Sequence, residues 1–356
     1  MEKLDDWHYN FSKIDGYNAT INFSLACRGT GRTTSFWQKA WKRFAGDGQK
    51  TIVQFRQENY INEKNLESIR NVIGKFTAVP VFHYKKTALG KSATIDVSCG
   101  GKTFLTVVAM SSSISCLKGI FTDNVAFWFA DEFICNERLG ERYCKDEAFK
   151  FKEAWTTFYR ESHGMKAYFA GNPYSLYTPY FSTFGINPKL LKLGTIVSGG
   201  GNDASHPLWA VERFQPQGKL LDELKKNPMY AKELDEYEKY ALYGEAINDE
   251  NIFIMEKAPK GFFLRFFFKI DGKNLGVWEN PNFMETPLFW VGISEEIGKR
   301  RDVYCFDFKD LSERTVLFSH EERQKFDHFR MAIRNRNVAF STLECDYLIE
   351  EIYPTL

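Results

Sequence analysis

Near the start of the chain, a buried-strand pattern passes through a glycine turn into a helical pattern, and this arrangement constrains the fold more than any other feature. Residues 17–27 read YNATINFSLAC, which is typical of a buried strand, and the turn RGTG follows. The next residues, TTSFWQKAWKRF, place five apolar side chains on one helical stripe: Phe36, Trp37, Ala40, Trp41 and Phe44. A second strand pattern covers 51–57 and a second helical pattern follows it. Strands that alternate with helices predict an α/β domain with a parallel sheet.

The glycine turn also has the features of a phosphate-binding loop. It lies between a strand and a helix, so backbone N–H groups and the helix N-terminus would hold a triphosphate. The candidate nucleotide-binding residues are Arg28, Gly29, Thr30, Gly31, Arg32, Thr33 and Thr34. Thr33 would place its hydroxyl on Mg²⁺. The loop departs from GxxxxGK(S/T) because Ala26 replaces the first glycine and Arg32 replaces the lysine. An ordinary strand-to-helix turn is therefore the alternative.

A second stretch, Gly101-Lys102-Thr103, carries the letters GKT in a different context. A strand pattern, FLTVVAM, follows it instead of a helix, so no helix N-terminus would face a phosphate. We predict a hairpin over 93–110 that turns at Gly100 and Gly101.

An apolar strand pattern over 125–133 contains two adjacent carboxylates, Asp131 and Glu132. In a phosphate-loop protein, Asp131 would bind Mg²⁺ and Glu132 would orient and deprotonate the attacking water. Acid pairs at strand ends also occur as solvated caps. Its position about a hundred residues after the loop, in the same predicted sheet, favours the catalytic interpretation.

The next strand pattern, 165–173, ends in Gly171-Asn172-Pro173, where the Asn172 amide could sense the γ-phosphate or the attacking water. Asparagine before proline is equally a turn signal. Between the two strands, Arg160 lies near the end of a predicted exposed helix, a position from which ring ATPases can present an arginine finger. Only the position of these two residues in the predicted sheet favours a function.

Length and composition set the domain organisation. The 356 residues exceed the size at which one core stops growing, about 250–300 residues, so more than one domain is expected. A glycine-rich break, GGGND, covers 199–203, and a charged helical pattern follows it. We predict a phosphate-loop domain over 1–203, a helical linker domain over 204–245 and a smaller α+β domain over 246–356.

Charge and cysteine usage exclude several classes of protein. With 47 basic and 46 acidic residues the net charge is +1, so any contact with nucleic acid must be local. Lys299, Arg300 and Arg301 are candidate DNA phosphate contacts, although a solvated charged face explains them as well. The sequence contains no CxxC pair, and this argues against structural zinc. The chain has neither a signal-peptide pattern nor a run of eighteen apolar residues, so we expect a cytosolic protein without a membrane partner.

With these residues in place, the chain resembles the DNA-packaging ATPases, or encapsidation proteins, of small tailed bacteriophages typified by phi-29, which are relatives of large terminase subunits. The resemblance is carried by INFSLACRGTGRTTSFWQKAWKRF, by NVAFWFADEFICNE and by TTFYRE with AGNPY after it. In the second region it is carried by YGEAINDENIFIMEK with NLGVWEN. The individual motifs are loose, but their order and spacing over nearly the whole chain are specific.

The resemblance implies a RecA-like (ASCE) P-loop ATPase domain, a short helical linker domain and an RNase H-like C-terminal domain without nuclease activity. It implies ATP and Mg²⁺ as cofactors, and a homopentameric ring at the portal, or connector, of an empty procapsid that drives double-stranded DNA inward. Such a protein would act in the host cytoplasm, docked on the procapsid during assembly, and would be absent from the mature virion. The sequence leaves open whether a packaging RNA takes part.

The resemblance also assigns roles to single residues. The loop cation, the metal ligands, the catalytic carboxylate and the coupling asparagine fall on Arg32, Thr33, Asp131, Glu132 and Asn172. Lys118 and Arg160 fall on two basic residues that act across the subunit interface. Tyr9 and Arg56 are candidates for the adenine end of the nucleotide. Two other hypotheses stay open here: a terminase-like ATPase with an active endonuclease, and a non-enzymatic scaffold whose loop binds nothing.

Overall fold

The computed structural model places two compact units in the chain, Met1–Ile247 and Asn248–Leu356. The residues that it describes are 8–89, 92–113, 123–136, 141–162, 164–176, 178–201, 206–226, 253–282, 287–295, 297, 303–335 and 337–356. None of the described helices is long and apolar enough to cross a membrane.

The first unit is built on a nine-stranded sheet with the order β3-β4-β5-β2-β6-β7-β1-β9-β8. The strands are β1 Ile21–Leu25, β2 Lys50–Phe55, β3 His83–Leu89, β4 Ser92–Cys99, β5 Lys102–Ala109, β6 Val125–Asp131, β7 Lys166–Gly171, β8 Thr195–Gly199 and β9 Trp209–Arg213. The strands from β5 through β9 in this order are all parallel, and β3, β4 and β8 extend the sheet by antiparallel pairing. Because β7 lies between β1 and β6, an extra strand separates the loop strand from the acid strand, as in ASCE ATPases.

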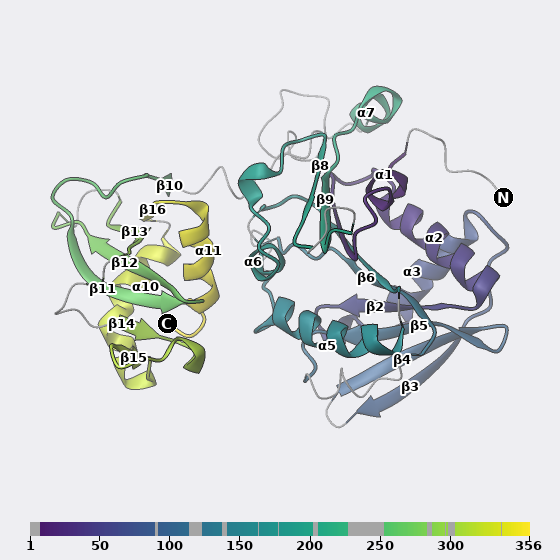
Figure 1. Cartoon of the computed structure of the whole chain (residues 1–356), viewed down its shortest axis with the longest axis horizontal. Coiled ribbons are helices and arrows are strands. Elements are labelled where there is room, and N and C mark those ends of the chain that lie inside the picture. The colour runs from purple at the N-terminus through teal and green to yellow at the C-terminus, as the bar shows by residue number, and fades with distance from the viewer. Residues whose placement is uncertain are drawn as a thin grey trace. The chain divides into compact units, whose positions relative to one another are not determined.

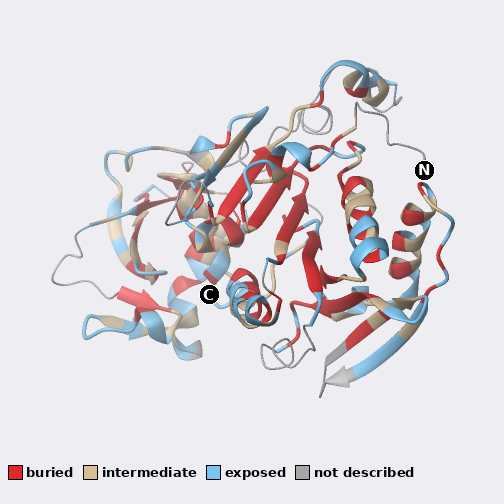
Figure 2. Cartoon of the chain, turned by 45° about the vertical axis from the view of Figure 1, so that its right-hand side comes forward, coloured by how far each residue is buried: buried red, intermediate tan, exposed pale blue. Residues whose placement is uncertain are grey.

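Helices cover both faces of this sheet, which explains why its central strands are apolar throughout (Figures 1 and 2). The helical elements are α1 Ser12–Asp15, α2 Arg32–Asp47, η1 Glu58–Tyr60, α3 Glu63–Gly74, α5 Glu147–Glu161, α6 Pro179–Thr183, η3 Pro188–Leu190 and α7 Gly218–Lys225. Apolar residues of α1, α2 and α3 form one core with one face, and those of α5 and α6 form a second core with the other. In β6, Trp128 belongs to the second core and its neighbour Phe129 to the first.

The second unit contains a seven-stranded sheet with the order β10-β16-β13-β12-β11-β14-β15. The strands are β10 Phe253–Ile254, β11 Phe263–Ile270, β12 Lys273–Glu279, β13 Phe289–Ile293, β14 Val303–Cys305, β15 Thr315–Leu317 and β16 Val338–Phe340. The helical elements are η5 Phe308–Asp310, η6 His320–Phe326, α10 Asp327–Arg334 and α11 Leu343–Ile352. Strands β11, β12 and β13 form an antiparallel meander, while β14 pairs parallel to β11 and β15 parallel to β14. If β11 is counted as strand 1, the order β13-β12-β11-β14-β15 becomes 3-2-1-4-5, which is the strand order of an RNase H-like fold.

The structure confirms the predicted α/β fold and most of its elements. Gly100 and Gly101 have φ values of 59° and 78°, so the GKT letters lie in a hairpin turn as predicted. The sequence did not predict β3, β8 or β9. Because β9 pairs with β1, the first sheet continues past residue 203, where we placed the domain boundary. Of the predicted linker, 206–226 are described and include α7, whereas 204–205 and 227–245 lie outside the described residues.

Candidate nucleotide-binding and catalytic site

The predicted phosphate loop connects β1 to α2 in the way the sequence indicated. Gly29 and Gly31 have φ values of 77° and 90°, which residues with a side chain rarely adopt, and Gly31 is the N-cap of α2. The Thr30 hydroxyl donates to the Cys27 carbonyl at 3.1 Å, and the Tyr9 N–H donates to the Thr30 carbonyl at 3.0 Å. These contacts hold the loop in a compact turn at the N-terminus of a 16-residue helix. Such a turn can bind an anion.

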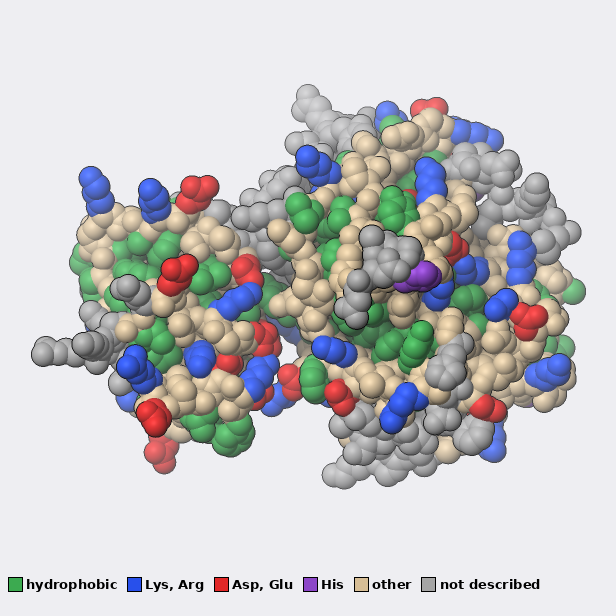
Figure 3. All heavy atoms as spheres, in the orientation of Figure 1, with side chains coloured by type: hydrophobic (Ala, Val, Ile, Leu, Met, Phe, Trp, Pro, Cys, Tyr) green, Lys and Arg blue, Asp and Glu red, His purple; other side chains and the backbone are tan. Residues whose placement is uncertain are grey.

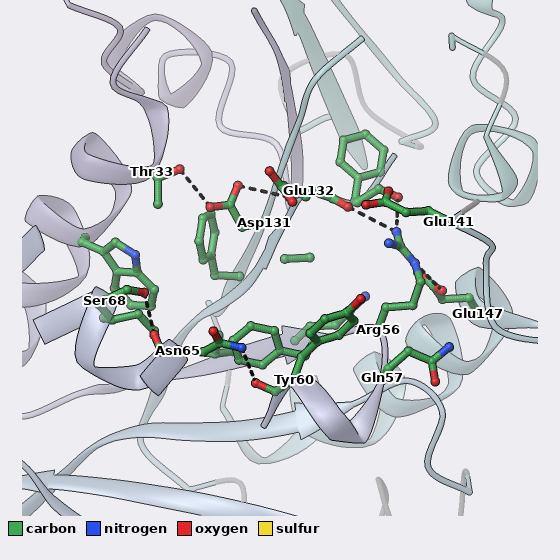
Figure 4. Close-up of a pocket in the computed structure, with 18 of the residues that line it drawn as sticks. Thr33, Arg56, Gln57, Tyr60, Asn65, Ser68, Asp131, Glu132, Glu141 and Glu147 are labelled. Atoms are coloured by element: carbon green, nitrogen blue, oxygen red, sulfur yellow. Dashed lines mark hydrogen bonds and ion pairs between the residues drawn. The ribbon is translucent and has the colours of Figure 1, made fainter. Parts of the chain in front are cut away.

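The first turn of α2 meets the acid pair at the end of β6. The Thr33 hydroxyl donates to Asp131 Oδ2 at 2.8 Å, and the backbone N–H of Glu132 donates to Asp131 Oδ1 at 3.1 Å (Figure 4). Thr34 follows in the same helical turn and is half-buried. A hydroxyl and a carboxylate this close supply the oxygen ligands that Mg²⁺ prefers beside a nucleotide phosphate. The residues therefore fit a magnesium nucleotide.

Glu132 has the electrostatic surroundings of a general base. Desolvation raises the pKa of its carboxyl, the neighbouring Asp131 charge raises it further, and Arg28 opposes the shift. Desolvation also raises the pKa of Asp131, against the charge of Arg32 and the hydrogen bond from Thr33. A carboxylate with a raised pKa accepts a proton from water more readily at neutral pH. Glu132 also has a φ of 53°, an uncommon conformation for a residue with a side chain.

Arg32 and Asn172 are brought together beneath the loop. The Arg32 guanidinium donates to the carbonyls of Ser24 and Gly171, the former at 3.1 Å, and to Asn172 Oδ1 at 3.0 Å. Arg32 is 7% exposed and Asn172 is 3% exposed. The structure thus joins the loop cation directly to the residue predicted to sense the phosphate. Arg28, in contrast, is exposed and donates to the Tyr174 hydroxyl at 2.8 Å.

Arg56 holds the backbone of the acid pair from the neighbouring strand. Its Nη2 donates to the carbonyls of Glu132 and Phe133 at 3.2 and 2.9 Å, and its Nε pairs with Glu147 Oε2 at 3.1 Å. Although burial lowers the pKa of Arg56, the Glu147 carboxylate raises it above its usual value. Glu147 also accepts from the Tyr180 hydroxyl at 3.0 Å. The sequence analysis missed Glu147 and Tyr180, because no local pattern marks them as partners of β2.

A pocket of about 620 Å³ opens beside the acid pair, between α2, α3 and the ends of β2 and β6. Figure 4 shows Thr33, Asp131 and Glu132 on one side of it, with Arg56 and Glu147 on another. Polar residues that also line it include Gln57, Tyr60, Asn65 and Ser68. Thr33 is the residue of the phosphate-loop turn that lines it. The pocket therefore extends from Thr33 and the acid pair.

The remaining predicted residues lie elsewhere. The Tyr9 ring packs against Phe11 and Phe214, its hydroxyl donates to Glu212 at 2.9 Å, and it is 1% exposed, so it presents no surface to an adenine. Arg160 is exposed in the last turn of α5. That helix ends beside the start of β6, where Ser162 accepts from Val125 N at 3.1 Å. Arg160 thus lies near the amino end of β6, whereas Asp131 lies at the carboxyl end of the same strand.

The predicted interface and DNA residues are not all within the described parts. Lys118 lies outside the described residues, as do Lys299, Arg300 and Arg301. On the face shown in Figure 3, basic and acidic side chains are interspersed on both units, as the net charge of +1 leads one to expect.

The second unit has no nuclease centre among its described residues. Asp310 Oδ1 and Oδ2 accept from the backbone N–H groups of Gly272 and Asp271 at 2.7 and 2.9 Å. Asp271 pairs with Lys309 at 2.5 Å, and Asp307 caps the N–H of Lys309 at 2.9 Å. Across the described residues, no group of three His, Cys, Asp or Glu side chains is placed to hold a metal ion. A two-metal nuclease needs converging carboxylates, so the endonuclease hypothesis is not favoured.

Comparison with known proteins identifies the family of the chain. The model of the family described as podovirus DNA encapsidation protein (Gp16) matches residues 3–355. The chain belongs to this family. Among curated proteins, the DNA packaging protein of Bacillus phage B103 is 24% identical over 309 residues, covering 86% of this chain and 88% of its own length. That of Bacillus phage phi29 is 22% identical over 314 residues, covering 88% and 86%.

Two solved structures match the fold of this encapsidation-family chain over almost its whole length. One, described as the Phi-28 gp11 DNA packaging motor, has a TM-score of 0.64 at 16% identity and covers 97% of both chains. The other, the bacteriophage Phi-29 viral genome packaging motor assembly, has a TM-score of 0.63 at 18% identity and covers 98% of this chain and 99% of its own. At these identities the likeness concerns the fold. It confirms the predicted α/β fold.

Proposed function

We propose that this chain is the ATPase subunit of a viral genome-packaging motor, which couples ATP hydrolysis to the movement of double-stranded DNA into an empty procapsid. The observation that carries the proposal is the contact between Thr33 and Asp131 at 2.8 Å, with Glu132 next in sequence. It brings a hydroxyl of the phosphate-loop helix to an acid pair on a strand one removed from β1. Family membership supports the DNA-packaging part of the proposal.

Each residue of the site then has a defined task. Bound Mg²⁺ would neutralise charge on the phosphate oxygens during in-line attack by water. Thr33 and Asp131 hold the metal side of the site, and the N–H groups from Arg28 to Thr34 hold the phosphates. Glu132 takes a proton from the attacking water, for which its raised pKa is suited. Arg56 fixes the backbone on which Glu132 stands, through the carbonyls of Glu132 and Phe133.

The proposed test is ATP hydrolysis by the purified full-length chain. We expect Mg²⁺-dependent turnover that increases when double-stranded DNA and portal-bearing procapsids are both present. Calorimetry that shows no affinity for ATP, in monomer or assembly, would contradict the proposal and support a non-enzymatic scaffold. If the chain acts in this way, it works on the procapsid in the host cytoplasm and leaves before the virion is complete. Immunoblotting of procapsids and of purified virions checks this location.

We further infer that the active assembly is a ring, a homopentamer by family resemblance, in which Arg160 and Lys118 complete a neighbour's site. The position of Arg160 near the amino end of β6, with Asp131 at the carboxyl end, supports action on another subunit. Subunits with Arg160→Ala should bind ATP but fail to hydrolyse it. Mixing them with Glu132→Gln subunits should restore part of the turnover. In the mixed ring, a subunit that keeps Glu132 can lie next to a subunit that keeps Arg160.

The mixing experiment has a matched control. Lys152→Ala removes a cation from an exposed position on the same helix and should leave turnover within about twofold. Absence of restoration in the mixed assembly, with both variants folded and assembled, would show that Arg160 does not act across subunits.

Contacts with DNA are proposed for Lys299, Arg300 and Arg301. Replacing all three by alanine should weaken DNA binding and reduce its dependence on salt, because fewer counterions are released when phosphates are contacted. The measurement is DNA affinity at several salt concentrations. An unchanged salt dependence would remove these residues from the interface. Whether a packaging RNA joins the assembly can be tested by nuclease treatment of active motors.

A further inference from the structure

Arg32 stands where a phosphate loop ordinarily carries lysine, yet its charged group faces the sheet beneath the loop. The side chain reaches the Ser24 carbonyl on β1 and the Gly171 carbonyl at the end of β7. It also donates to the amide oxygen of Asn172, immediately after β7, at 3.0 Å. Two of the three acceptors lie on neighbouring parallel strands, and the third directly follows one of them. Arg32 therefore bridges the end of the loop strand and the end of the strand that carries Asn172.

The chemistry of arginine suits this bridge better than that of lysine. A guanidinium carries five N–H donors fixed in one plane, whereas a lysine ammonium is a compact charge on a flexible stem. Arg32 is 7% exposed, so its charge is almost cut off from water. If the guanidinium turned away, the Ser24 carbonyl and the Asn172 amide oxygen would each lose this donor, while the Gly171 carbonyl would keep the hydrogen bond from the Ala26 N–H at 3.3 Å. The bridge is made by the two terminal nitrogens of the guanidinium, Nη1 and Nη2.

The bridge also fixes which way the Asn172 amide points. Arginine has no acceptor, so the amide oxygen must face Arg32 and the amide NH₂ must point away from it. Because Asn172 is only 3% exposed, packing limits rotation of its side chain. The direction of an amide that donates to a phosphate or a water thus depends on Arg32.

We propose that Arg32 is a positioning residue, whose side chain holds the end of β7 and the Asn172 amide in register with the phosphate loop, and that its guanidinium does not bind the phosphates. The inference rests on the proposed ATPase function. Arg28, an exposed cation of the same loop, contacts the Tyr174 hydroxyl.

The decisive variant is Arg32→Lys, which restores the residue that phosphate loops usually carry. If Arg32 positions Asn172, lysine cannot reproduce the planar fork, so turnover falls about tenfold or more. The affinity for a fluorescent ATP analogue with Mg²⁺ stays within about threefold of wild type, and the nucleotide-free chain unfolds at a lower temperature. If Arg32 binds the phosphates, lysine serves at least as well, and turnover and affinity equal or exceed those of wild type. That result overturns the inference.

A double-mutant cycle with Asn172→Ala supplies the second test. If Arg32 acts through Asn172, the double variant loses no more turnover than the worse single variant, and the losses in unfolding temperature are likewise non-additive. Losses that multiply in turnover and add in unfolding temperature overturn the inference. A wild-type chain without ATP turnover would refute the proposed function instead. The unfolding temperatures of the nucleotide-free variants would then still decide whether Arg32 and Asn172 act as a pair.

Discussion

Both units contain carboxylates that accept hydrogen bonds from other protein groups, but the two units surround these carboxylates differently. In the first unit, Asp131 and Glu132 are exposed at a pocket, and the Asp131 carboxylate accepts hydrogen bonds from the Thr33 hydroxyl and the Glu132 N–H. In the second unit, Asp310 is 4% exposed and accepts two backbone N–H groups. Glu279 is 1% exposed and pairs with Arg265 and with His328.

This difference separates carboxylates that can do chemistry from those that hold a fold. Neighbouring protein atoms desolvate Asp131 and Glu132, and their two negative charges lie side by side, so the pKa of Glu132 is raised. A bound cation or proton therefore stabilises such carboxylates. A carboxylate such as Asp310, whose oxygens already accept backbone donors, gains little from a ligand. The residue type is the same, and the partners decide the role.

The largest expected effect is the loss of turnover in Glu132→Gln. The amide keeps the size of the side chain but cannot take a proton from water, so ATP turnover should fall about 100-fold or more. In the second unit, Asp307→Asn is the matched control and should leave turnover within about twofold. Steady-state ATPase assays of the two folded variants check the comparison. Equal activity in both would show that the acid pair of the first unit has no catalytic role.

A smaller effect is expected on stability when the buried carboxylate of the second unit is removed. Asp310→Ala leaves the N–H groups of Asp271 and Gly272 without this acceptor, which should lower the free energy of unfolding by about 2–3 kcal/mol. Asp310→Asn keeps an acceptor oxygen and should fall between this variant and wild type. Denaturant unfolding of the full chain gives the order of the three. A wild-type midpoint for Asp310→Ala would mean that this carboxylate is dispensable to the turn.

The parts of the site that the sequence predicted follow from local rules. Thr33, Asp131 and Asn172 all come at the carboxyl ends of apolar strands or in the turn after one, and parallel strands bring such ends to one edge of a sheet. The apolar runs and the turn residues that bound them identify those strands without knowledge of the strands with which they pair. The meeting of Thr33 with Asp131, 98 positions away, is a consequence of that geometry.

The parts that the sequence did not predict depend on pairing over long distances. Strand β9 is a five-residue segment whose parallel pairing with β1 places it in the first sheet. Arg56 and Glu147 are 91 positions apart, and nothing in either local sequence indicates an ion pair. The burial of Arg32 was also unexpected, because the motif suggests a cation that faces the phosphates. Which way a long side chain turns is decided by acceptors on another strand.

The smallest expected effect is a gain in stability when Asp131, the proposed metal ligand, is made neutral. Desolvation raises the pKa of Asp131 in the folded chain, so the folded state binds a proton more readily than the unfolded state does. Stability therefore falls as pH rises from the ordinary aspartate pKa of about 3.9 toward the raised value, and the penalty is complete above it. Asp131→Asn removes this penalty and should slightly raise the unfolding temperature of the nucleotide-free chain at pH 7. The gain should shrink as the pH approaches 4, whereas Asp307→Asn should show no such gain. A lower unfolding temperature for Asp131→Asn at pH 7 would place Asp131 with Asp310, among the carboxylates that hold the fold.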